Sequence, residues 1–213
     1  MGAPFFGATN VTTRAFAGRW AFTAAFTVSA DTPHCNYNVS FGANVEVTGG
    51  VCAVARHAQA RVRGIKRVQI EPHLSVTAAA SAEWIPIKPK TDAACMHAMI
   101  HVMLFENARS RLDIDFLKHM TASPYLVAPN GFYLRDPDTR KPLVWDLKSG
   151  KAVVFDTPGI DPALDGDFLA SGLEVLPDQE LVTHEAAPVR SAFGKLLDHE
   201  RTFTPEWAQG ICD

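Results

Sequence analysis

The chain has 213 residues, of which 47% are hydrophobic and 20% are charged, and its formal net charge is -3. These proportions are those of ordinary globular domains, and they exclude a disordered, collagen-like or coiled-coil protein. The slight negative charge gives no support to nucleic-acid binding, and no apolar run approaches the roughly 18 residues that a transmembrane helix needs.

The first half of the chain alternates between strand and helix patterns. Residues 36–41 alternate in polarity and end in a glycine turn, which predicts a strand. Residues 51–63 repeat apolar side chains at spacings of three and four, which predicts a helix that Gly64 ends. Residues 66–70 predict a second strand. A strand–helix–strand unit of about thirty residues has the length of a parallel crossover, so we expect the two strands to be adjacent and parallel.

The remaining elements are expected in the following order. The sequence predicts a short helix at 75–82, a short strand at 84–87, a long helix from Asp92 to about Asn107, and a helix at 113–120. Turn residues then predict two hairpins, pairing 125–127 with 132–134 and 143–145 with 152–155. After a loop at 157–167 we expect a short strand and turn at 172–183, a helix at 189–199, and a last helix capped by Thr204.

Both ends of the sequence favour a piece of a longer polypeptide. The first forty residues hold large apolar side chains, among them Phe16, Trp20 and Phe26, which need a partner surface. The last helix begins at Thr204 and Pro205, and the sequence stops about two turns later. A terminal helix that frays is the alternative, and the residues leave both interpretations open. We expect no signal peptide, because no basic segment precedes the first apolar residues.

The carboxyl ends of the two predicted strands are the first candidate for a site. In parallel α/β units a ligand binds beyond these ends, where Gly42, Asn44 and Glu71 lie. An acidic residue at the end of the second strand can accept hydrogen bonds from ribose hydroxyls. The glycine fingerprint of dinucleotide-binding enzymes is absent, which disfavours a nicotinamide dehydrogenase. Plain turn residues and a solvated Glu71 remain the alternative.

Two further candidates lie on the long predicted helix. Asp92 is at its start, where a free carboxylate can accept hydrogen bonds from the N–H edge of a guanine, although simple helix capping is the more common role. His97 and His101 are one turn apart and could hold zinc. Because no Glu follows the first histidine, we expect packed or hydrogen-bonded histidines and no metal site.

Other patterns do not identify a catalytic residue, so the catalytic residues stay unknown. No nucleophile elbow of the form G-x-S-x-G occurs. The four cysteines form no CxxC or CxxxC pair, so we expect no zinc or iron–sulfur site with neighbouring ligands. The basic residues between Arg56 and Arg67 predict a solvated helix face.

A series of segments in fixed order carries a family resemblance. These segments are residues 41–44 (FGAN), 60–64 (ARVRG), 68–73 (VQIEPH) and 82–94 (AEWIPIKPKTDAA). In this order and spacing they resemble the molybdopterin oxidoreductases of the dimethyl sulfoxide reductase superfamily. Weaker likenesses at 116–119, 123–146 and 204–207 extend the resemblance over most of the chain.

The resemblance implies an α/β fold with a Rossmann-like parallel sheet, helices on both of its faces, and a β-hairpin insertion. Its expected parts are an α/β region at 1–122, the hairpin insertion at 123–157, and a return segment with the start of a truncated helix at 158–213. In the family such a region binds the guanosine end of one molybdopterin guanine dinucleotide, a molybdenum cofactor, for two-electron redox chemistry. The cofactor-binding residues carried over by motif are Gly42, Asn44, Glu71, Pro72, His73 and Asp92.

The sequence also departs from the family pattern. His73 stands where the pattern prefers Arg, Lys90 where it prefers Gly, and residues 12–19 offer no Cys, Ser or Asp to molybdenum. An iron–sulfur cluster is expected in the full-length parent, but this chain has no cysteine motif for it. We therefore expect part of a catalytic subunit, inactive alone, that works with its remaining domains or an electron-transfer subunit in the cytoplasm or periplasm. A non-catalytic remnant with weak guanine-nucleotide binding is the alternative.

Overall fold

The computed structural model of the protein describes residues 31–48 and 50–213. These residues form two compact units, residues 31–89 and residues 90–213. Helices and sheets are mixed, and most strand pairings among the described residues are antiparallel. None of the helices in these residues is long and apolar enough to span a membrane. The apolar segment with Phe16, Trp20 and Phe26, and the stretch at 12–19, lie outside the described residues.

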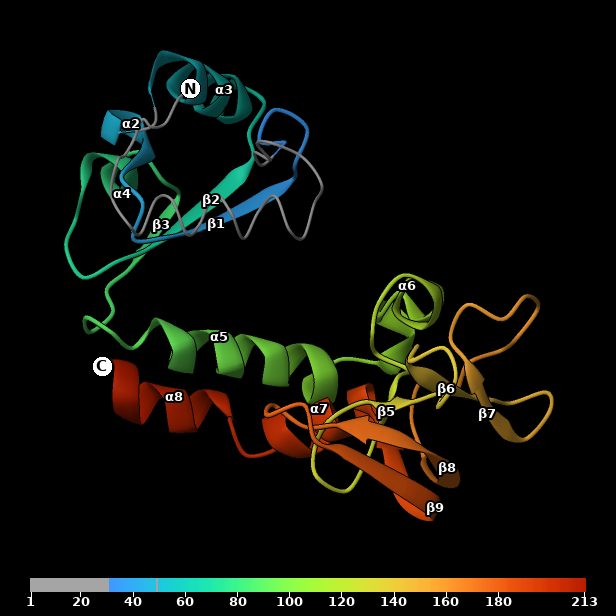
Figure 1. The fold of residues 1–213 in the computed structure, drawn as a ribbon. Helices are drawn as coiled ribbons and strands as arrows, with labels where there is room; N and C mark the ends of the chain where they lie inside the picture. Colours follow the sequence, from blue (N-terminus) through green and yellow to red (C-terminus); the bar gives the residue numbers. More distant parts are fainter. Residues whose placement is uncertain (1–30, 49) are drawn as a thin grey trace. The chain divides into compact units, whose positions relative to one another are not determined.

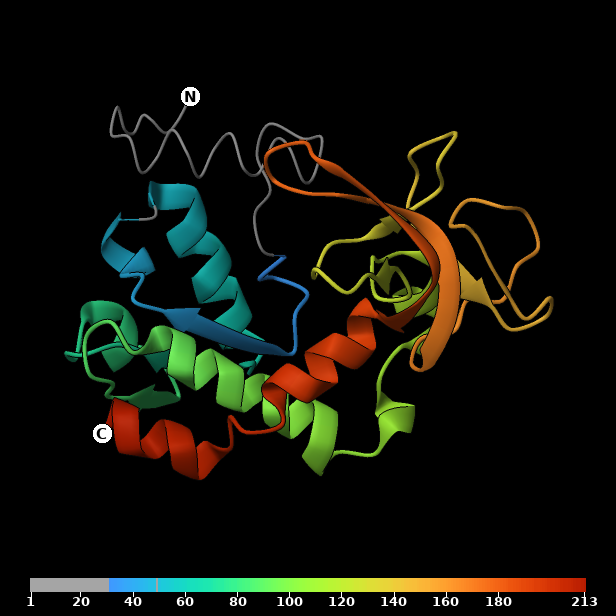
Figure 2. The same cartoon turned by 60° about the horizontal axis from the view of Figure 1, so that its bottom comes forward.

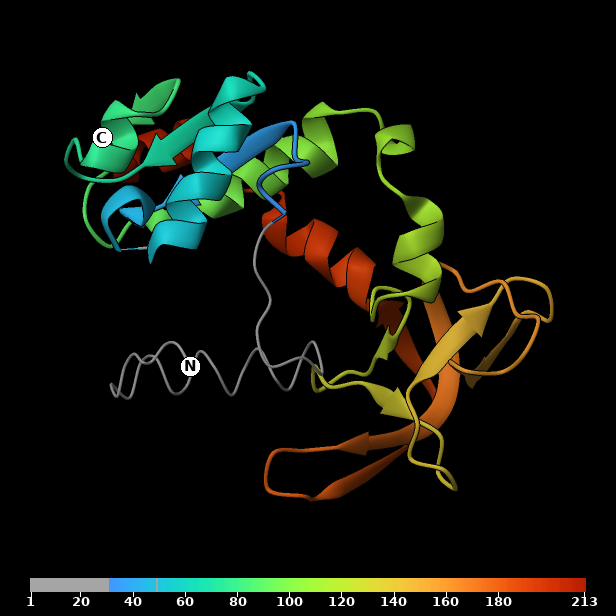
Figure 3. The same cartoon turned by 90° about the horizontal axis from the view of Figure 1, so that it is seen from above.

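The first unit is built on a three-stranded parallel sheet in the order β1–β2–β3. Its strands are β1 (Tyr37–Phe41), β2 (Lys66–Ile70) and β3 (Glu83–Ile85), and its helices are α2 (Val45–Thr48), α3 (Gly50–Val62) and α4 (Val76–Ala79). The register sets Tyr37 opposite Lys66 and runs to the end of both strands, which confirms the predicted parallel pair. Figures 1 and 3 show α3 lying on one face of this sheet.

The central strand β2 is the most buried part of the first unit. Residues 67–70 are all buried, because a neighbouring strand lies on each side of them. Gly64 ends helix α3 with a φ of 86°, a left-handed conformation that glycine adopts without strain. The amide of Ile65 donates a hydrogen bond to the carbonyl of Ala60 at 3.2 Å, so the chain turns from the helix directly into β2.

The second unit combines helices with antiparallel sheets. Its helical segments are α5 (Asp92–His101), the π-helix η1 (Val102–Glu106), the 3-10 helix η2 (Arg109–Arg111), α6 (Ile114–His119), α7 (Ala192–Glu200) and α8 (Pro205–Cys212). Its strands are β4 (Leu126–Val127), β5 (Leu134–Arg135), β6 (Leu143–Asp146), β7 (Lys151–Val154), β8 (Asp167–Val175) and β9 (Leu181–Ser191). The long helix predicted from Asp92 is confirmed in extent, with its last 5 residues in π-helical form.

The long ribbon of strands β8 and β9 was only partly predicted (Figure 2). We expected a short strand and turn at 172–183, whereas the paired strands run from Asp167 to Ser191. A bulge between Ala170 and Gly172 shifts the register of the pair. Polar and apolar residues therefore do not alternate along the whole ribbon, and the sequence pattern shows only part of it.

The helix predicted at 189–199 begins later than expected, so the first part of that prediction is wrong. Val189 and Ser191 are buried residues of strand β9. The side chain of Ser191 accepts a hydrogen bond from the Gly194 amide at 3.1 Å, which caps the helix and sets its start at Ala192. Burial of the last strand residues in the sheet thus outweighs their helical spacing.

Of the two predicted hairpins, the second is confirmed and the first is wrong in its pairing. Strands β6 and β7 pair along their whole length, from Leu143 opposite Val154 onward. In the first hairpin, β4 pairs with β9 and β5 pairs with β8, and a single bridge between Val127 and Tyr133 is what remains of the direct pairing. Each arm is only 2 residues long, so the longer ribbon supplies better partners than the other arm.

The core of the second unit joins strands that are far apart in the sequence. Its buried apolar residues are Leu126, Ala128, Leu134, Leu143, Ala170 and Val189. The rings of Trp145 and Phe168 stack against it, with 4.6 Å between their centroids and 11° between their planes. The segment boundaries expected at residues 122 and 157 remain a prediction beside the observed division after Pro89.

Asp146 closes the turn between β6 and β7 and makes stability depend on pH. Its carboxylate accepts hydrogen bonds from the amides of three residues, at 3.2 Å from Lys148, 3.0 Å from Ser149 and 2.9 Å from Asp161. Hydrogen bonds from Ser149 and Asp161 lower the pKa of Asp146 from 3.8 to about 2. The ionised carboxylate therefore stabilises the native state above pH 3.8, and this contribution is lost as the pH falls to about 2.

We expect Asp146→Asn to lower the urea concentration at the unfolding midpoint near neutral pH. The gap from the wild type should narrow as the pH falls from 3.8 to about 2, because the wild-type carboxylate then becomes neutral as well. Urea unfolding followed by circular dichroism at several pH values measures this gap. The control Asp138→Asn changes an exposed acid and should match the wild type throughout. A gap for Asp146→Asn that does not vary with pH would contradict the prediction.

Candidate functional site

The carboxyl ends of β1 and β2 bring two loops of the first unit together. Gly42 follows β1 directly, and its amide donates a hydrogen bond to the carbonyl of Ile70 at the end of β2, at 2.9 Å. The φ of Gly42 is 59°, in the left-handed region, and the space that a Cβ would occupy is open. A bound group can therefore approach the backbone closely at this point.

A hydrogen-bond network through Thr77 fastens these two loops to each other. The side-chain oxygen of Asn44 accepts hydrogen bonds from the Thr77 hydroxyl at 2.9 Å and from the Thr77 amide at 3.3 Å. The oxygen of the same hydroxyl accepts a hydrogen bond from the Glu46 amide at 3.0 Å. Thr77 is completely buried, so losing any of these bonds would leave a polar group without water. Asn44 thus connects the loop after β1 to helix α4, which follows β2.

Glu71, the acid that we expected to meet a ribose, is buried and shapes its own loop. Its carboxylate oxygens accept hydrogen bonds from the Gln69 side chain at 2.9 Å and from the Ser75 amide at 3.1 Å, and the residue is 2% exposed. Burial raises the pKa of Glu71, but these hydrogen bonds and the charge of His73 outweigh it, so the pKa lies below its ordinary value. Pro72 and His73 are exposed and form the outer surface of the loop.

A buried ion pair anchors helix α2 in the first unit. Arg67 is 3% exposed in strand β2, and its guanidinium lies 2.7 Å from the carboxylate of Glu46. Burial raises the pKa of Glu46, but contacts with Arg67 and Thr77 outweigh it and lower the pKa. The prediction of a solvated basic face is therefore wrong for Arg67, because its strand is the central one of the sheet.

Asp92 lies in the second unit, where it is the first residue of helix α5. Thr91 occupies the N-cap position, and its side chain makes no capping hydrogen bond. Among the described residues, the partly exposed carboxylate of Asp92 has no hydrogen bond or ion pair. A carboxylate at a helix start is favoured by the helix dipole and is free here to accept hydrogen bonds from a ligand. That Asp92 shares one nucleotide with Gly42 and Glu71 remains a prediction.

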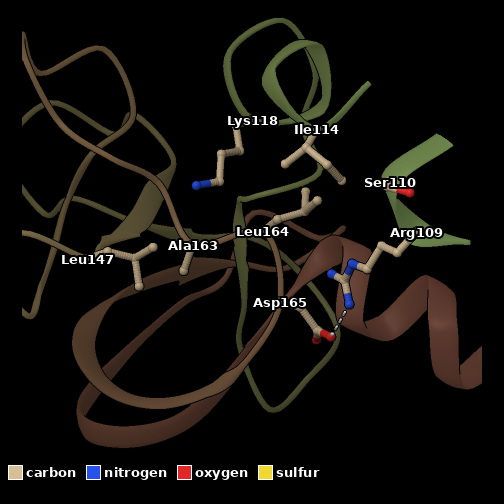
Figure 4. A pocket seen from close by; sticks show the side chains of 8 residues that line it. All are labelled: Arg109, Ser110, Ile114, Lys118, Leu147, Ala163, Leu164 and Asp165. Atoms are coloured by element: carbon tan, nitrogen blue, oxygen red, sulfur yellow. Dashed lines mark hydrogen bonds and ion pairs between the residues drawn. The ribbon is translucent and has the colours of Figure 1, made fainter. Parts of the chain in front are cut away.

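The second unit also holds a hollow of about 350 Å³ (Figure 4). Its two cationic side chains, Arg109 and Lys118, both have acidic partners. Arg109 lies 3.5 Å from Asp165, and Lys118 lies 2.7 Å from Asp161. Because these charges balance one another, the hollow has no excess positive charge to attract an anionic cofactor. The strand ends of the first unit are therefore the better candidate for a nucleotide site.

Comparison with known proteins places the chain in one family. No family model matches the chain. It is 31% identical to one polypeptide of the sulfite dehydrogenase of Allochromatium vinosum, its A subunit, over 163 residues, which cover 70% of the chain. It is also 31% identical, over 150 residues and 61% of the chain, to the alpha subunit of the chlorate reductase of Ideonella dechloratans. The chain belongs to the dimethyl sulfoxide reductase family of molybdopterin oxidoreductases.

This membership confirms the family resemblance of the sequence. A further molybdopterin oxidoreductase relative, the molybdopterin-containing subunit of the thiosulfate reductase of Salmonella typhimurium, is 32% identical over 95 residues and 45% of the chain. The three matches cover 15%, 16% and 12% of those relatives, so the chain spans a small part of their length. Each relative is named as one subunit of its enzyme, which supports partner subunits and a molybdenum–pterin cofactor for the molybdopterin oxidoreductase family.

The Thr77 network predicts a clear difference between two small substitutions. Thr77→Val keeps the shape of the side chain but leaves Asn44 and the Glu46 amide without their hydroxyl partner. We expect this variant to lose about 2 kcal/mol of unfolding free energy, because unsatisfied buried polar groups are costly. Thr77→Ser keeps the hydroxyl and should lose about 1 kcal/mol, for one methyl group. Urea unfolding measures both values, and a valine variant that is no less stable than the serine variant would contradict this prediction.

Proposed function

We propose that the chain is part of the catalytic subunit of a molybdopterin-dependent oxidoreductase and binds the guanosine end of a molybdopterin guanine dinucleotide. The site is formed by the loops after β1 and β2 and is completed by Asp92. The parallel pairing of β1 and β2 carries the proposal, because parallel α/β units bind nucleotides beyond the carboxyl ends of their strands. A Rossmann-like sheet with helices on both of its faces belongs to the same proposal.

Three properties of the strand-end loops support a guanosine there. Gly42 leaves open space above a left-handed backbone, so a phosphate or ribose can approach it closely. Glu71 holds the loop whose outer residues, Pro72 and His73, are exposed. The buried side-chain oxygen of Gln69 has no hydrogen-bond partner among the described residues. An unsatisfied buried acceptor next to these loops suits a site where a ligand supplies the missing donor.

The proposed roles of the side chains follow from their chemistry. When bound, the molybdenum–pterin group supplies two-electron redox chemistry, and the residues of this chain bind and orient its nucleotide end. The Asp92 carboxylate accepts hydrogen bonds from the N–H groups of guanine, a pair of donors that adenine does not present on one edge. His73 offers a ring N–H to ribose or phosphate from the outer side of its loop, while Glu71 and Asn44 act as positioning residues.

Two glycines at opposite edges of the parallel sheet allow a matched test. Gly42, with a φ of 59°, stands at the carboxyl ends of the strands, and Gly64, with a φ of 86°, precedes the amino end of β2. Both have open space at the Cβ position, and alanine in this conformation costs about 1–2 kcal/mol at either place. We expect Gly42→Ala to weaken GMP binding by about tenfold, because its methyl group fills the space that the nucleotide needs.

The control Gly64→Ala should lose similar stability but bind GMP as the wild type does. Titration of the intact chain with GMP and with AMP, followed by nuclear magnetic resonance, measures the affinities. Wild type and Gly64→Ala should both prefer GMP. Equal weakening by the two glycine substitutions, or no preference of the wild type for GMP over AMP, would contradict the proposed site.

A further inference from the structure

The carboxylate of Glu200 lies between two histidines in the second unit. His97 Nδ1 is 3.0 and 2.9 Å from the two oxygens of Glu200, and His199 Nδ1 is 3.0 Å from one of them. The side chain of Glu200 is 2% exposed, whereas those of His97 and His199 are 34% and 60% exposed. The cluster is therefore a buried anion flanked by two imidazoles that reach the surface.

The charge of Glu200 has no permanent positive partner. Among the described residues no lysine or arginine forms an ion pair with it, and its ion-pair partners are His97 and His199. A carboxylate taken out of water is costly unless a positive group or a metal compensates its charge. Neutral imidazoles do not supply that charge, but their ring nitrogens are ligands for a cation that does.

Neighbouring residues fix the orientation of the cluster. The ring of Phe203 packs against both imidazoles, with 4.7 Å between its centroid and that of His97, and 5.0 Å to that of His199. His101 turns to the backbone carbonyl of Glu200, with 2.8 Å between Nδ1 and the oxygen. The structure thus brings His97 together with His199, rather than with His101 as the sequence spacing suggested. Groups held in this way lose little freedom when they bind a metal.

We propose that His97, His199 and Glu200 form a binding site for a divalent transition metal, with zinc as the cation that suits it best. Their ligand atoms lie within 4.8 Å of one another. On a tetrahedral zinc with bonds of about 2.0 Å, ligand atoms are about 3.3 Å apart, so small side-chain rotations complete the site. Two histidines and one glutamate form an open zinc site whose fourth position takes water.

Zinc binding exchanges hydrogen bonds for coordination bonds and links two helices. A neutral imidazole that binds the metal through Nδ1 carries its proton on Nε2, where the exposed side of the ring meets water. His97 belongs to α5, whereas His199 and Glu200 belong to α7. The metal therefore cross-links α5 to α7 and should raise the melting temperature of the chain.

Titration of the intact, metal-free chain with zinc chloride, followed by calorimetry, tests the proposal. We expect one zinc per chain, and His97→Ala and His199→Ala should each weaken binding by more than about 100-fold, since even second-shell losses cost 10- to 100-fold. The control His119→Ala removes an imidazole that is 45% exposed and 3.7 Å from a single carboxylate, that of Asp115, and should bind zinc as the wild type does.

A second measurement uses cobalt(II) as a spectroscopic substitute for zinc. The wild type should show the strong visible absorption of four-coordinate cobalt, and both histidine variants should lose it. Because Glu200 is buried and its substitution can disturb folding, the two partly exposed histidines carry the test. Absence of zinc binding in the wild type, or its survival in either histidine variant, would overturn the proposal and leave a hydrogen-bonded cluster only.

Discussion

The hydroxyl of Thr77 joins the parts of the first unit on which the proposed nucleotide site depends. It donates to Asn44 in the loop after β1, accepts from the amide of Glu46 in α2, and itself belongs to α4 after β2. Parallel strands bring their carboxyl ends to one edge of the sheet, but they do not fix the loops that follow. The surface around Gly42 therefore depends on this buried network as much as on the strands.

The buried carboxylates of the chain show why Asp92 is a distinctive residue. Glu46, Glu71, Glu174 and Glu200 are each held by hydrogen bonds or ion pairs, and the pKa of each lies below its ordinary value because these contacts outweigh burial. Such acids stay ionised, but their oxygens already serve the fold. Among the acids discussed here, Asp92 alone combines a helix start with a carboxylate that has no partner in the described residues. It is therefore the acid best suited to meet a ligand.

The sequence predicts what is local and misses what is distant. The β1–α3–β2 unit follows from periodicity and length alone, and the position of Asp92 follows from its helix. The partners of Asn44 and His97 could not be predicted, because they lie 33 and 103 residues away and only the packed fold brings them near. The β8–β9 ribbon was missed because its bulge breaks the alternation of polarity. Arg67 was misplaced because neighbouring basic residues hid that it belongs to a central strand.

Hydrogen–deuterium exchange of the intact chain, with and without GMP, tests the central claim most directly, because it locates a bound nucleotide without changing any residue. Slower amide exchange at 42–48, at 71–77 and at the start of α5, with no change in the β8–β9 ribbon, is the predicted result. AMP should protect these segments less than GMP does. Protection confined to other segments, or protection by AMP equal to that by GMP, would contradict a guanosine site at the ends of β1 and β2.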